Sequence, residues 1–554
     1  MKRYRMLAAV LAAVLAAGML AGCGGTGAKN PEEPGRISDE GDSGAVPGLR
    51  KYDEPVTLTT FLSSSDSLER DLAMTEDGET VEDNRYTRWF KEALNIELSY
   101  KWIAKSDTYD TKLNLAISSR QYADVMLVTA EQAQQLYKAG KILGMSEIYE
   151  KYATEETKEA MSSDAASEDI FSAVTFDGEL YGIPKMWSSY DSAQFLWVRT
   201  DWLEKYNLPE PNTMEDVIAI AKRFAAEDPD GNGEKDTMGI GFVSAADAAM
   251  GGLTGFFNGY HSYLNLFLEK DGSLQFSNFL PESKKALAAL QELYRAGAIS
   301  REYATTDHEA LSEAIIAGKC GMFYGQHWMP LNPFTDAVSL DDSAVWKAYP
   351  IPSCDDTPAS VQLTTGVTSW WVVSKDCANP EAVLKMINLL YSTPESEMPE
   401  YVTREDVSNY YAFNPMLVQD PQVNIKQMKS FKAYLNGEEI DTTKDGVDIK
   451  IRQYEAYKAG NENFWWVDQI YGIEGCPIEI LNDRYIGEKL MVTNQFHGVS
   501  TATMIKNSAT LAKLVDQTLV EIITGAKDVS EWDLLEQRWL SLGGQKILDE
   551  VNAQ

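Results

Sequence analysis

The amino-acid sequence predicts an α/β protein built from two lobes. Its 554 residues are too many for one hydrophobic core, since a domain usually holds roughly 100–200 residues. Strand-like and helix-like segments alternate from residue 56 onward, as in a βαβ series with a mainly parallel sheet. The alternation restarts near residue 195. A second set of elements after a complete first set indicates two lobes of similar construction.

The first set of elements holds three predicted strands. Residues 56–62 have strand character, residues 96–102 alternate apolar and polar side chains, and residues 123–128 form a short apolar run. Apolar side chains at helical spacing around Trp89 and around Leu113 occupy the two gaps between these strands. This order of strands and helices predicts parallel neighbours in one sheet.

The second set opens with the predicted strand 195–198. Thr213 stands three residues before Asp216 at the start of an apolar helical pattern, and this pair predicts a capped helix N-terminus. Further helices are expected at 281–296 and 307–317, each closed by a glycine, and after Asn379-Pro380.

The first 23 residues have the design of an export signal. A basic head precedes a short Ala/Leu-rich run, which is too short and too rich in alanine for a membrane span. The sequence Leu20-Ala21-Gly22-Cys23 resembles the lipobox of bacterial lipoproteins. This resemblance implies that residues 1–22 are a lipoprotein signal peptide and that Cys23 carries thioether-linked and acyl lipid, palmitate included. An ordinary export signal that ends in cysteine is the alternative.

A lipid on Cys23 would hold the protein on the extracytoplasmic face of the cell membrane. Residues 23–50 are Gly, Pro, Asp, Glu and Ser with few apolar side chains, which is typical of a flexible tether. We therefore expect a lipid-anchored protein whose folded part begins near residue 51.

Acidic residues outnumber basic ones by a wide margin. The chain has 49 Lys and Arg against 84 Asp and Glu, a net charge of −35. Removal of the signal takes away three basic residues, and the remaining 46 against 84 give −38. Such a surface repels nucleic acid and anionic lipid headgroups, so neither is an expected partner.

Four cysteines follow Cys23, and their spacing is not that of a metal or redox motif. Disulfides and buried free thiols both remain open for them. They are Cys320, Cys354, Cys377 and Cys476.

Several phrases in the chain resemble the extracellular solute-binding proteins of bacterial ABC importers, family 1 type, in the branch similar to alginate-oligosaccharide-binding proteins. Each phrase is short, but they occur in the order expected for this family and span nearly all of residues 51–554. They are Tyr-Ala-Asp-Val at 122–125, Phe-Asp-Gly-Glu-Leu-Tyr-Gly-Ile-Pro at 176–184, Arg-Thr-Asp-Trp-Leu at 199–203, Ala-Gly-Lys-Cys-Gly-Met at 317–322 followed by Trp328, and the ending from Trp539 to Asn552.

The resemblance implies a two-lobe fold of the periplasmic-binding-protein type, with a hinge and a ligand held between the lobes. Mapped onto this sequence, the N-terminal lobe comprises residues 51–183 plus 346–395, and the C-terminal lobe comprises residues 184–345 plus 396–554. The implied partners are an oligosaccharide and the permease subunits of an ABC importer. We expect a monomer.

An oxygen-rich loop follows the helix predicted after Thr213. Hard cations need several oxygens at about 2.3–2.6 Å, and a tight loop with glycine at its sixth position, here Gly233, supplies them. Position twelve is Gly239, whereas an EF-hand has a bidentate Glu there. The candidate calcium ligands are Asp228, Asp230, Asn232, the backbone carbonyl of Glu234, and Asp236. Similar alginate-binding proteins carry a calcium loop at the matching place, which supports a structural calcium ion; a solvated Asp/Gly turn is the alternative.

Proteins bind sugars with aromatic platforms and a fan of polar side chains, so aromatic residues in loops at the lobe crossings are the candidates for a binding site. The serine run 63–65 and Asp66 follow the first strand, where the carboxyl ends of parallel strands meet ligands. Trp371 alternates with Trp370 along a strand and is expected in the core. The candidate ligand-binding residues are Trp328, Trp187, Tyr190, Trp370, His497 and Asp66.

The sequence contains no GxSxG, HExxH, phosphate-binding or dinucleotide-binding motif, and its four histidines are not at metal-ligand spacing. A binding protein is therefore expected, not an enzyme. The alternatives are an exported glycoside hydrolase, because 84 acidic residues make many accidental carboxylate pairs, and a binding protein for a peptide or another solute.

Overall fold

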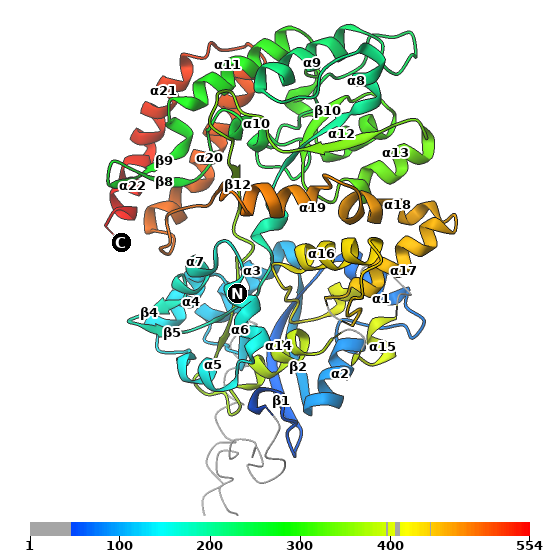
Figure 1. Ribbon diagram of the computed structural model, residues 1–554. Helices are drawn as coiled ribbons and strands as arrows, with labels where there is room; N and C mark the ends of the chain where they lie inside the picture. The colour runs from blue at the N-terminus through cyan, green and yellow to red at the C-terminus, as the bar shows by residue number, and fades with distance from the viewer. Residues whose placement is uncertain (1–45, 395–396, 405–409, 444, 554) are drawn as a thin grey trace, which may run out of the picture.

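The computed structural model describes residues 46–394, 397–404, 410–443 and 445–553. Two lobes lie one above the other in Figure 1, with blue and cyan chain in the lower lobe and green and red chain in the upper one. The predicted signal peptide 1–22, Cys23 and most of the tether 23–50 fall outside the described residues.

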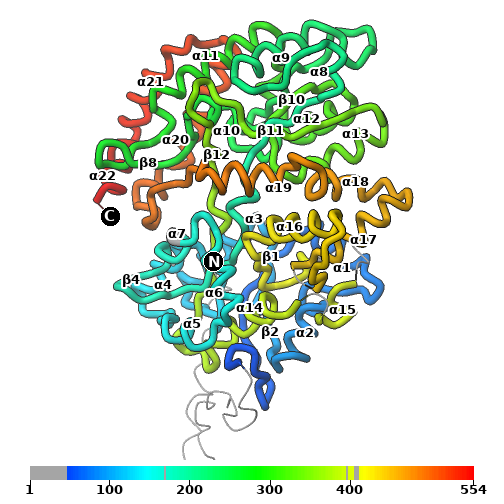
Figure 2. Tube along the Cα trace, in the orientation of Figure 1, coloured from blue at the N-terminus to red at the C-terminus, as the bar shows by residue number. Residues whose placement is uncertain are grey.

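The first lobe is built from the N-terminal third of the chain and a later return. Its strands are β1 (Val56–Ser64), β2 (Ile96–Lys105), β3 (Val125–Val128), β4 (Thr175–Phe176), β5 (Glu179–Leu180), β6 (Ile183–Pro184) and β13 (Trp370–Val373). Its helices are α1 (Asp66–Ala73), α2 (Arg85–Leu94), α3 (Ser106–Ser118), α4 (Ala130–Lys138), α5 (Ser146–Tyr152), α6 (Glu155–Ser162), α7 (Ser167–Ser172), α14 (Ala382–Ser392) and α15 (Glu400–Thr403). The helix α14 packs against α2, α5 and α6, so chain segments far apart in sequence share one core (Figure 2).

Only part of the first-lobe sheet is parallel. Strands β1 and β2 pair in parallel, as predicted, but β3 pairs antiparallel with β13, which also pairs antiparallel with β6. A carboxylate takes the place of ladder bonds between β1 and β3: Asp124 Oδ2 accepts the backbone N–H of Thr59 at 2.8 Å and its hydroxyl at 2.5 Å. The expected mainly parallel sheet is therefore corrected to a mixed arrangement.

The second lobe holds the middle of the chain and its C-terminus. Its strands are β7 (Phe195–Arg199), β8 (Phe267–Lys270), β9 (Ser273–Phe276), β10 (Met322–Gly325), β11 (Trp346–Tyr349), β12 (Val361–Gln362) and β14 (Met491–Val492). Its helices are α8 (Thr200–Tyr206), α9 (Met214–Ala226), α10 (Thr254–Asn258), α11 (Glu282–Arg295), α12 (His308–Ile316), α13 (Thr335–Leu340), α16 (Val423–Leu435), α17 (Val447–Lys458), α18 (Trp465–Val467), α19 (Pro477–Glu479), α20 (Ala502–Ile523), α21 (Glu531–Trp539) and α22 (Gln545–Val551).

The predicted start of α9 is confirmed. Thr213 Oγ1 accepts the backbone N–H of Asp216 at 3.1 Å, and Asp216 Oδ2 accepts the backbone N–H of Thr213 at 2.9 Å. This reciprocal pair satisfies two N–H groups that the first helical turn leaves without partners. The helix leads directly into the candidate calcium loop.

Each lobe has its own cluster of buried apolar side chains, and the chain passes between the clusters three times within the described residues. It leaves the first cluster after Met186 and enters the second at Tyr190. It returns between Leu363 and Val367, and it crosses again between Met416 and Ile425. The first crossing lies close to the predicted one at 183/184.

The other two crossings lie elsewhere than the sequence indicated. Residues 346–363 belong to the second lobe and not to the first, because β11 pairs antiparallel with β7 and places that central strand between two neighbours. The first lobe also extends beyond residue 395, since Phe413 and Met416 pack in its core. Long-range strand pairing decides the first of these positions, and packing of apolar side chains in the first-lobe core decides the second.

No helix in the described part of the chain is both long and apolar enough to cross a membrane. Each of the four cysteines after Cys23 carries a free thiol. The sequence left disulfides and free thiols open for these cysteines, and the structure has free thiols.

Candidate ligand site

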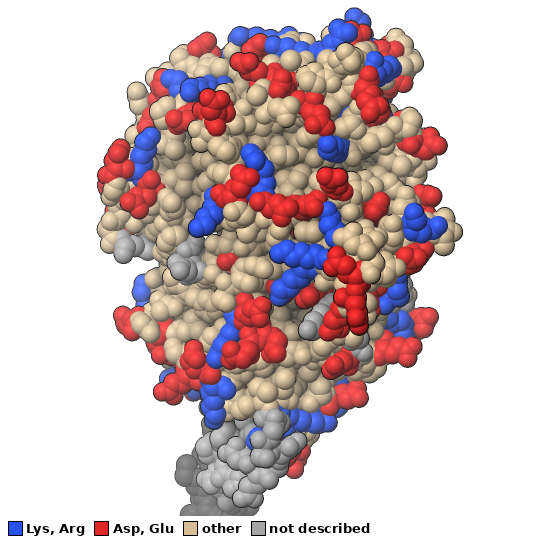
Figure 3. All heavy atoms as spheres, viewed as in Figure 1, with Lys and Arg blue, Asp and Glu red and all other residues tan. Residues whose placement is uncertain are grey.

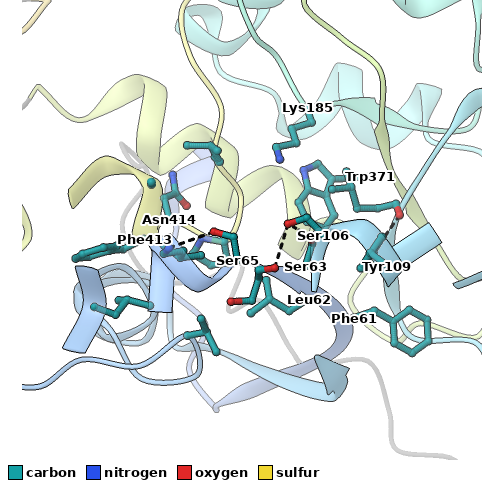
Figure 4. Close-up of a pocket in the computed structure, with 18 residues that line it drawn as sticks. Phe61, Leu62, Ser63, Ser65, Ser106, Tyr109, Lys185, Trp371, Phe413 and Asn414 are labelled. Carbon is teal, nitrogen blue, oxygen red and sulfur yellow. Dashed lines mark hydrogen bonds between the residues drawn. The ribbon is translucent and has the colours of Figure 1, made fainter. Parts of the chain in front are cut away.

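A pocket of about 210 Å³ opens at the carboxyl ends of the first-lobe strands (Figure 4). It is bordered by the end of β1, by Ser106 at the start of α3, by Lys185 just after β6, and by the segment 412–417. Lys185 stands one residue before the first crossing, and Leu417 lies at the start of the third. The pocket therefore lies where the first lobe meets the hinge, the usual position for a ligand in open α/β folds.

Polar side chains gather on the walls of this pocket. Ser63 donates its hydroxyl to Ser106 Oγ at 3.3 Å, and Ser106 donates to the carbonyl of Ser64 at 3.0 Å. Trp371 has a buried indole Nε1–H with no hydrogen-bond partner. Lys185 is half-buried, and burial lowers the pKa of its ammonium group. Figure 4 shows all four side chains around one opening.

A buried ion pair holds the far wall of the pocket. Arg85 of α2 donates Nε and Nη2 to Glu79 Oε2 at 3.0 and 2.7 Å, and both side chains are 2% exposed. The same guanidinium donates Nη1 to the carbonyl of Arg404 at 2.6 Å and lies 5.2 Å from the ring centroid of Phe413, which lines the pocket. Arg85 thus ties the 404–413 region to the body of the lobe.

The first crossing is bonded to each of the other two. Ser189 accepts the backbone N–H of Gly366 at 3.0 Å, and Ser188 donates to the carbonyl of Pro421 at 2.7 Å. A Cβ on Gly366 would lie 2.0 Å from the carbonyl oxygen of Trp187, so only glycine allows this approach. Asp164 of the first lobe accepts the backbone N–H and hydroxyl of Ser189 at 2.7 and 2.6 Å. These contacts define a compact hinge.

A polar network continues from the hinge into the second lobe. Gln419 donates its backbone N–H to the carbonyl of Met186 at 3.0 Å. Asp191 accepts Asn424 Nδ2 at 2.9 Å, and Asn424 in turn accepts the hydroxyl of Tyr471 at 2.7 Å and lies 3.5 Å from His327 Nε2. Burial raises the pKa of the Asp191 carboxyl. Burial likewise lowers the pKa of the His327 imidazole, although the nearby Asp191 charge acts in the opposite direction.

A second cavity, of about 300 Å³, is lined by residues of both lobes. Two of the predicted ligand-binding residues, Trp370 and His497, border it. Trp370 is buried, and its Nε1 donates to the carbonyl of Ile170 at 2.9 Å. Ser172 donates its hydroxyl to the carbonyl of His497 at 3.4 Å, a contact between the lobes.

The remaining predicted residues are placed as follows. Trp187 lies on the first crossing and is 37% exposed. Tyr190 is buried in the second-lobe cluster and donates its hydroxyl to the carbonyl of Ser163 at 3.3 Å, so it packs inside the hinge. Trp328 is half-buried against the second-lobe core, and its Nε1 donates to Gln326 Oε1 at 2.7 Å.

Asp66 does not line the first-lobe pocket. Its side chain is 95% exposed and pairs with Lys105 at 2.7 Å, and that hydrogen bond and charge lower the pKa of its carboxyl. The serines before it do line the pocket. The loop was therefore predicted as a ligand-facing segment, but the residue chosen from it points away.

Sequence reasoning missed Lys185 and placed Trp371 in the core. Trp371 is 4% exposed, as a core residue would be, yet it borders the pocket. The sequence did contain a signal for Lys185. It is a single lysine directly after an apolar strand at a lobe crossing, and the local sequence pattern does not explain it. No comparable signal distinguishes Trp371 from Trp370, because both lie in one buried strand.

The candidate calcium loop brings its oxygens together outside the pocket. Asp228 accepts the backbone N–H groups of Asn232 and Gly233 at 3.1 and 2.9 Å. Asn232 donates its amide to Asp230 at 2.7 Å and to Asp236 at 3.1 Å. Burial and the neighbouring Asp228 raise the pKa of the Asp230 carboxyl. A cation would relieve this crowding of carboxylates, so the side chains fit a calcium ion.

Two features set the loop apart from an EF-hand. A Cβ on Gly239 would lie 1.8 Å from the carbonyl oxygen of Ala221, so the twelfth position has no room for a glutamate. Lys319 pairs with Asp236 at 2.6 Å and lowers the pKa of that carboxyl. The available set is three carboxylates, the Asn232 amide oxygen and the Glu234 carbonyl; water would complete the six to eight ligands that calcium takes.

The family of bacterial extracellular solute-binding proteins matches residues 73–397, more than half of the chain, and the protein belongs to this family. Among curated relatives, the polygalacturonan/rhamnogalacturonan-binding protein YtcQ of Bacillus subtilis (strain 168) is 22% identical over 478 residues, 84% of this chain and 87% of the relative. The lipoprotein LipO of the same strain is 24% identical over 461 residues, 82% of this chain and 86% of the relative.

Solved structures share the two-lobe fold. An EF-hand mutant of the Streptococcus pneumoniae ABC-transporter substrate-binding protein FusA, in complex with fructo-nystose, aligns with a TM-score of 0.58 at 17% identity, over 90% of this chain and 98% of that one. The alginate-binding protein AlgQ2 without calcium ion aligns with a TM-score of 0.56 at 14% identity, again over 90% and 98%. The predicted family and fold class are confirmed.

Proposed function

We propose that this protein captures an oligosaccharide between its lobes and delivers it to the permease subunits of an ABC importer. The observation that carries the proposal is the polar pocket beside the hinge, where the first crossing is bonded to each of the other two. The relatives YtcQ and FusA, named for polygalacturonan and fructooligosaccharide, support a carbohydrate ligand. A binding protein is favoured over an enzyme because the family and its neighbours are binding proteins.

The hinge supplies the mechanism. Closure around a ligand brings a second-lobe surface against the sugar face that the first-lobe pocket leaves open. Because the first crossing is bonded to each of the other two, the three turn together while each lobe keeps its own core. Aromatic side chains near the junction, Trp187 and Trp328, are the proposed stacking platforms for sugar rings.

The location follows from the N-terminus. Acyl lipid on Cys23 would tether the protein to the extracytoplasmic face of the cell membrane, within reach of a permease. Residues 23–50 are the proposed tether between the lipid and the folded part, because they carry few apolar side chains. The similarity to the lipoprotein LipO supports this anchor. A monomeric protein suits a tethered carrier.

Calcium is proposed as a structural ion in the loop 228–236. Bound there, it would neutralise the three carboxylates and fix the turn between α9 and the bridge of Met238 with Cys320. The relatives described as an EF-hand mutant and as calcium-free support an ion in this branch. The loop lies away from the pocket residues in sequence and in lobe, so its role is stability.

Calorimetry with a panel of neutral and acidic oligosaccharides tests the function, with product analysis of the same mixtures. Saturable binding without turnover, together with a smaller radius of gyration by small-angle X-ray scattering, is the expected result. Cleaved sugar would establish a hydrolase instead. If the protein bound peptides and no sugar, its ligand class would be peptides and not oligosaccharides.

A further inference from the structure

The first-lobe pocket has a chemical bias that a neutral sugar does not require. Among the described residues that line it, none is an aspartate or a glutamate, although the chain as a whole carries 84 of them. Binding sites for neutral sugars use acceptors as well as donors, because each hydroxyl group both donates and accepts. This pocket has no carboxylate acceptor among its described lining residues, and it has two donors in the Lys185 ammonium group and the unpaired Trp371 indole N–H.

Lys185 is the only cation among the described lining residues, and it has no acidic partner there. Burial is the sole cause that lowers its pKa; no carboxylate offsets it. A half-buried ammonium group without a counter-charge is costly, since desolvation disfavours the charged form. An anion brought by a ligand would remove that cost.

Trp371 supplies an independent observation. Its side chain is 4% exposed, it borders the pocket, and its Nε1–H has no hydrogen-bond partner. A buried donor left unpaired costs free energy, so such groups are rare unless a ligand satisfies them. Figure 4 shows the indole nitrogen on the side of the ring that faces Lys185.

The start of α3 adds to the positive potential. Ser106 opens this thirteen-residue helix at the pocket edge, and the cap residue Lys105 makes no side-chain bond to its first turn. The N–H groups of the first turn and the helix dipole favour negative charge at this end, and the exposed Asp107 of the same turn offsets part of this effect.

We infer that this pocket binds a carboxylate of an acidic oligosaccharide, with the Lys185 ammonium group and the Trp371 indole N–H as donors. The inference rests on the proposed function and narrows its ligand to sugars that carry uronic acid units. Ser63 and Ser106 would bond the ring hydroxyls next to the carboxylate.

The net charge of −35 does not oppose this assignment. Charges further apart than the Debye length, about 8 Å at physiological ionic strength, are largely screened, whereas a contact inside a pocket is not. On the face shown in Figure 3, acidic and basic side chains are interspersed over both lobes, with basic groups along the junction between them.

The experiment compares a galacturonate trisaccharide with its methyl ester, which has the same sugar and linkage but no charge. Wild-type protein should bind the free acid about ten- to hundredfold more tightly than the ester, as expected for a charge-assisted hydrogen bond. In Lys185→Met the two affinities should converge, because the acid loses its ion pair and the ester has none to lose. Trp371→Phe should weaken binding of the acid by about two- to tenfold.

Lys375→Met is the matched control, since Lys375 is exposed just beyond the opposite end of β13. It should leave the preference for the acid unchanged, and melting curves of every variant should show that the lobe folds. Equal binding of acid and ester by the wild type would overturn the inference and leave the oligosaccharide function intact. Equal loss of both ligands in Lys185→Met would also overturn it. Binding of no sugar in the wider panel of neutral and acidic oligosaccharides would overturn the proposed function as well.

Discussion

Arg85→Met should destabilise the first lobe and weaken ligand binding, because Arg85 connects the lobe core to the wall of the pocket. The substitution keeps a long side chain but leaves Glu79 charged and buried, with 2% of its side chain exposed. Breaking a buried ion pair in this way costs about 3–5 kcal/mol. For a lobe of this size, each kcal/mol lowers the melting temperature by roughly 2–4 °C. We therefore expect a decrease of about 6–20 °C in the first-lobe transition by calorimetry.

A double variant separates stability from binding. In Glu79→Gln/Arg85→Met the buried charge is gone, and the glutamine carbonyl still accepts the backbone N–H that Arg85 donates to Glu79. The remaining cost is the lost bond to the Arg404 carbonyl and the lost contact with Phe413, about 1–3 kcal/mol together. Both variants lose these wall contacts, so both should bind ligand about two- to tenfold more weakly than the wild type.

Arg88→Met on the same helix is the control. Arg88 pairs with Asp83 at 2.7 Å at the surface, where such pairs contribute less than about 1 kcal/mol. It should change the melting temperature by only a few degrees and the affinity not at all. If Arg85→Met melts like Arg88→Met, or if the double variant is no more stable than the single one, the buried pair does not hold the wall as argued.

Four further results are expected. A chelator should lower the melting temperature and added calcium should restore it by mass action, whereas Asp230→Ala should show no such response; identical curves in wild type with and without calcium would refute the ion. Cys23→Ser should move the protein from the membrane to the soluble fraction, and continued pelleting with membranes would disprove the lipid anchor. Trp328→Ala should weaken sugar binding by about thirtyfold, or about 2 kcal/mol, with a modest loss of melting temperature; an unstable variant of wild-type affinity would assign Trp328 to the core. Stability should fall as pH drops below the ordinary histidine pKa, because His327 takes up a proton in the unfolded chain but stays neutral when buried, where its pKa is lowered. His327→Gln should reduce this loss of stability. Parallel profiles of stability against pH for the wild type and the variant would contradict the prediction.

Local sequence patterns predicted the elements of this fold well, because they depend on neighbouring residues. The strand beginning at Val56 and the cap formed by Thr213 and Asp216 are examples, since alternation and capping are decided within a few positions. The second crossing was misplaced because β11 finds its partner about 150 residues earlier in β7, and nothing in residues 346–349 shows that pairing. The role of Asp124 as a link between β1 and β3 was hidden for the same reason.

The candidate site was predictable in its segments and less so in its residues. The loop after the first strand and the stretch after Pro184 were both identified as ligand-facing, and both line the pocket. The choice of Asp66 failed because its pairing with Lys105 depends on where β2 ends, which is a tertiary contact. Burial alone would also have misled for Trp371, since a side chain can be almost fully covered and still line a pocket.

The position of Lys185 explains how ligand binding could favour closure. Lys185 borders the pocket, and the carbonyl of its neighbour Met186 accepts the backbone N–H of Gln419 on another crossing. A ligand bonded to Lys185 would therefore order the first crossing at the place where it touches the third. Gly366 brings the second crossing within van der Waals reach of the first crossing at Trp187. Ordering one crossing restricts the other two. A ligand that fills the pocket therefore removes part of the conformational freedom that the hinge would lose on closure. The entropy cost of closing the lobes is lower by that part, so closure becomes more favourable.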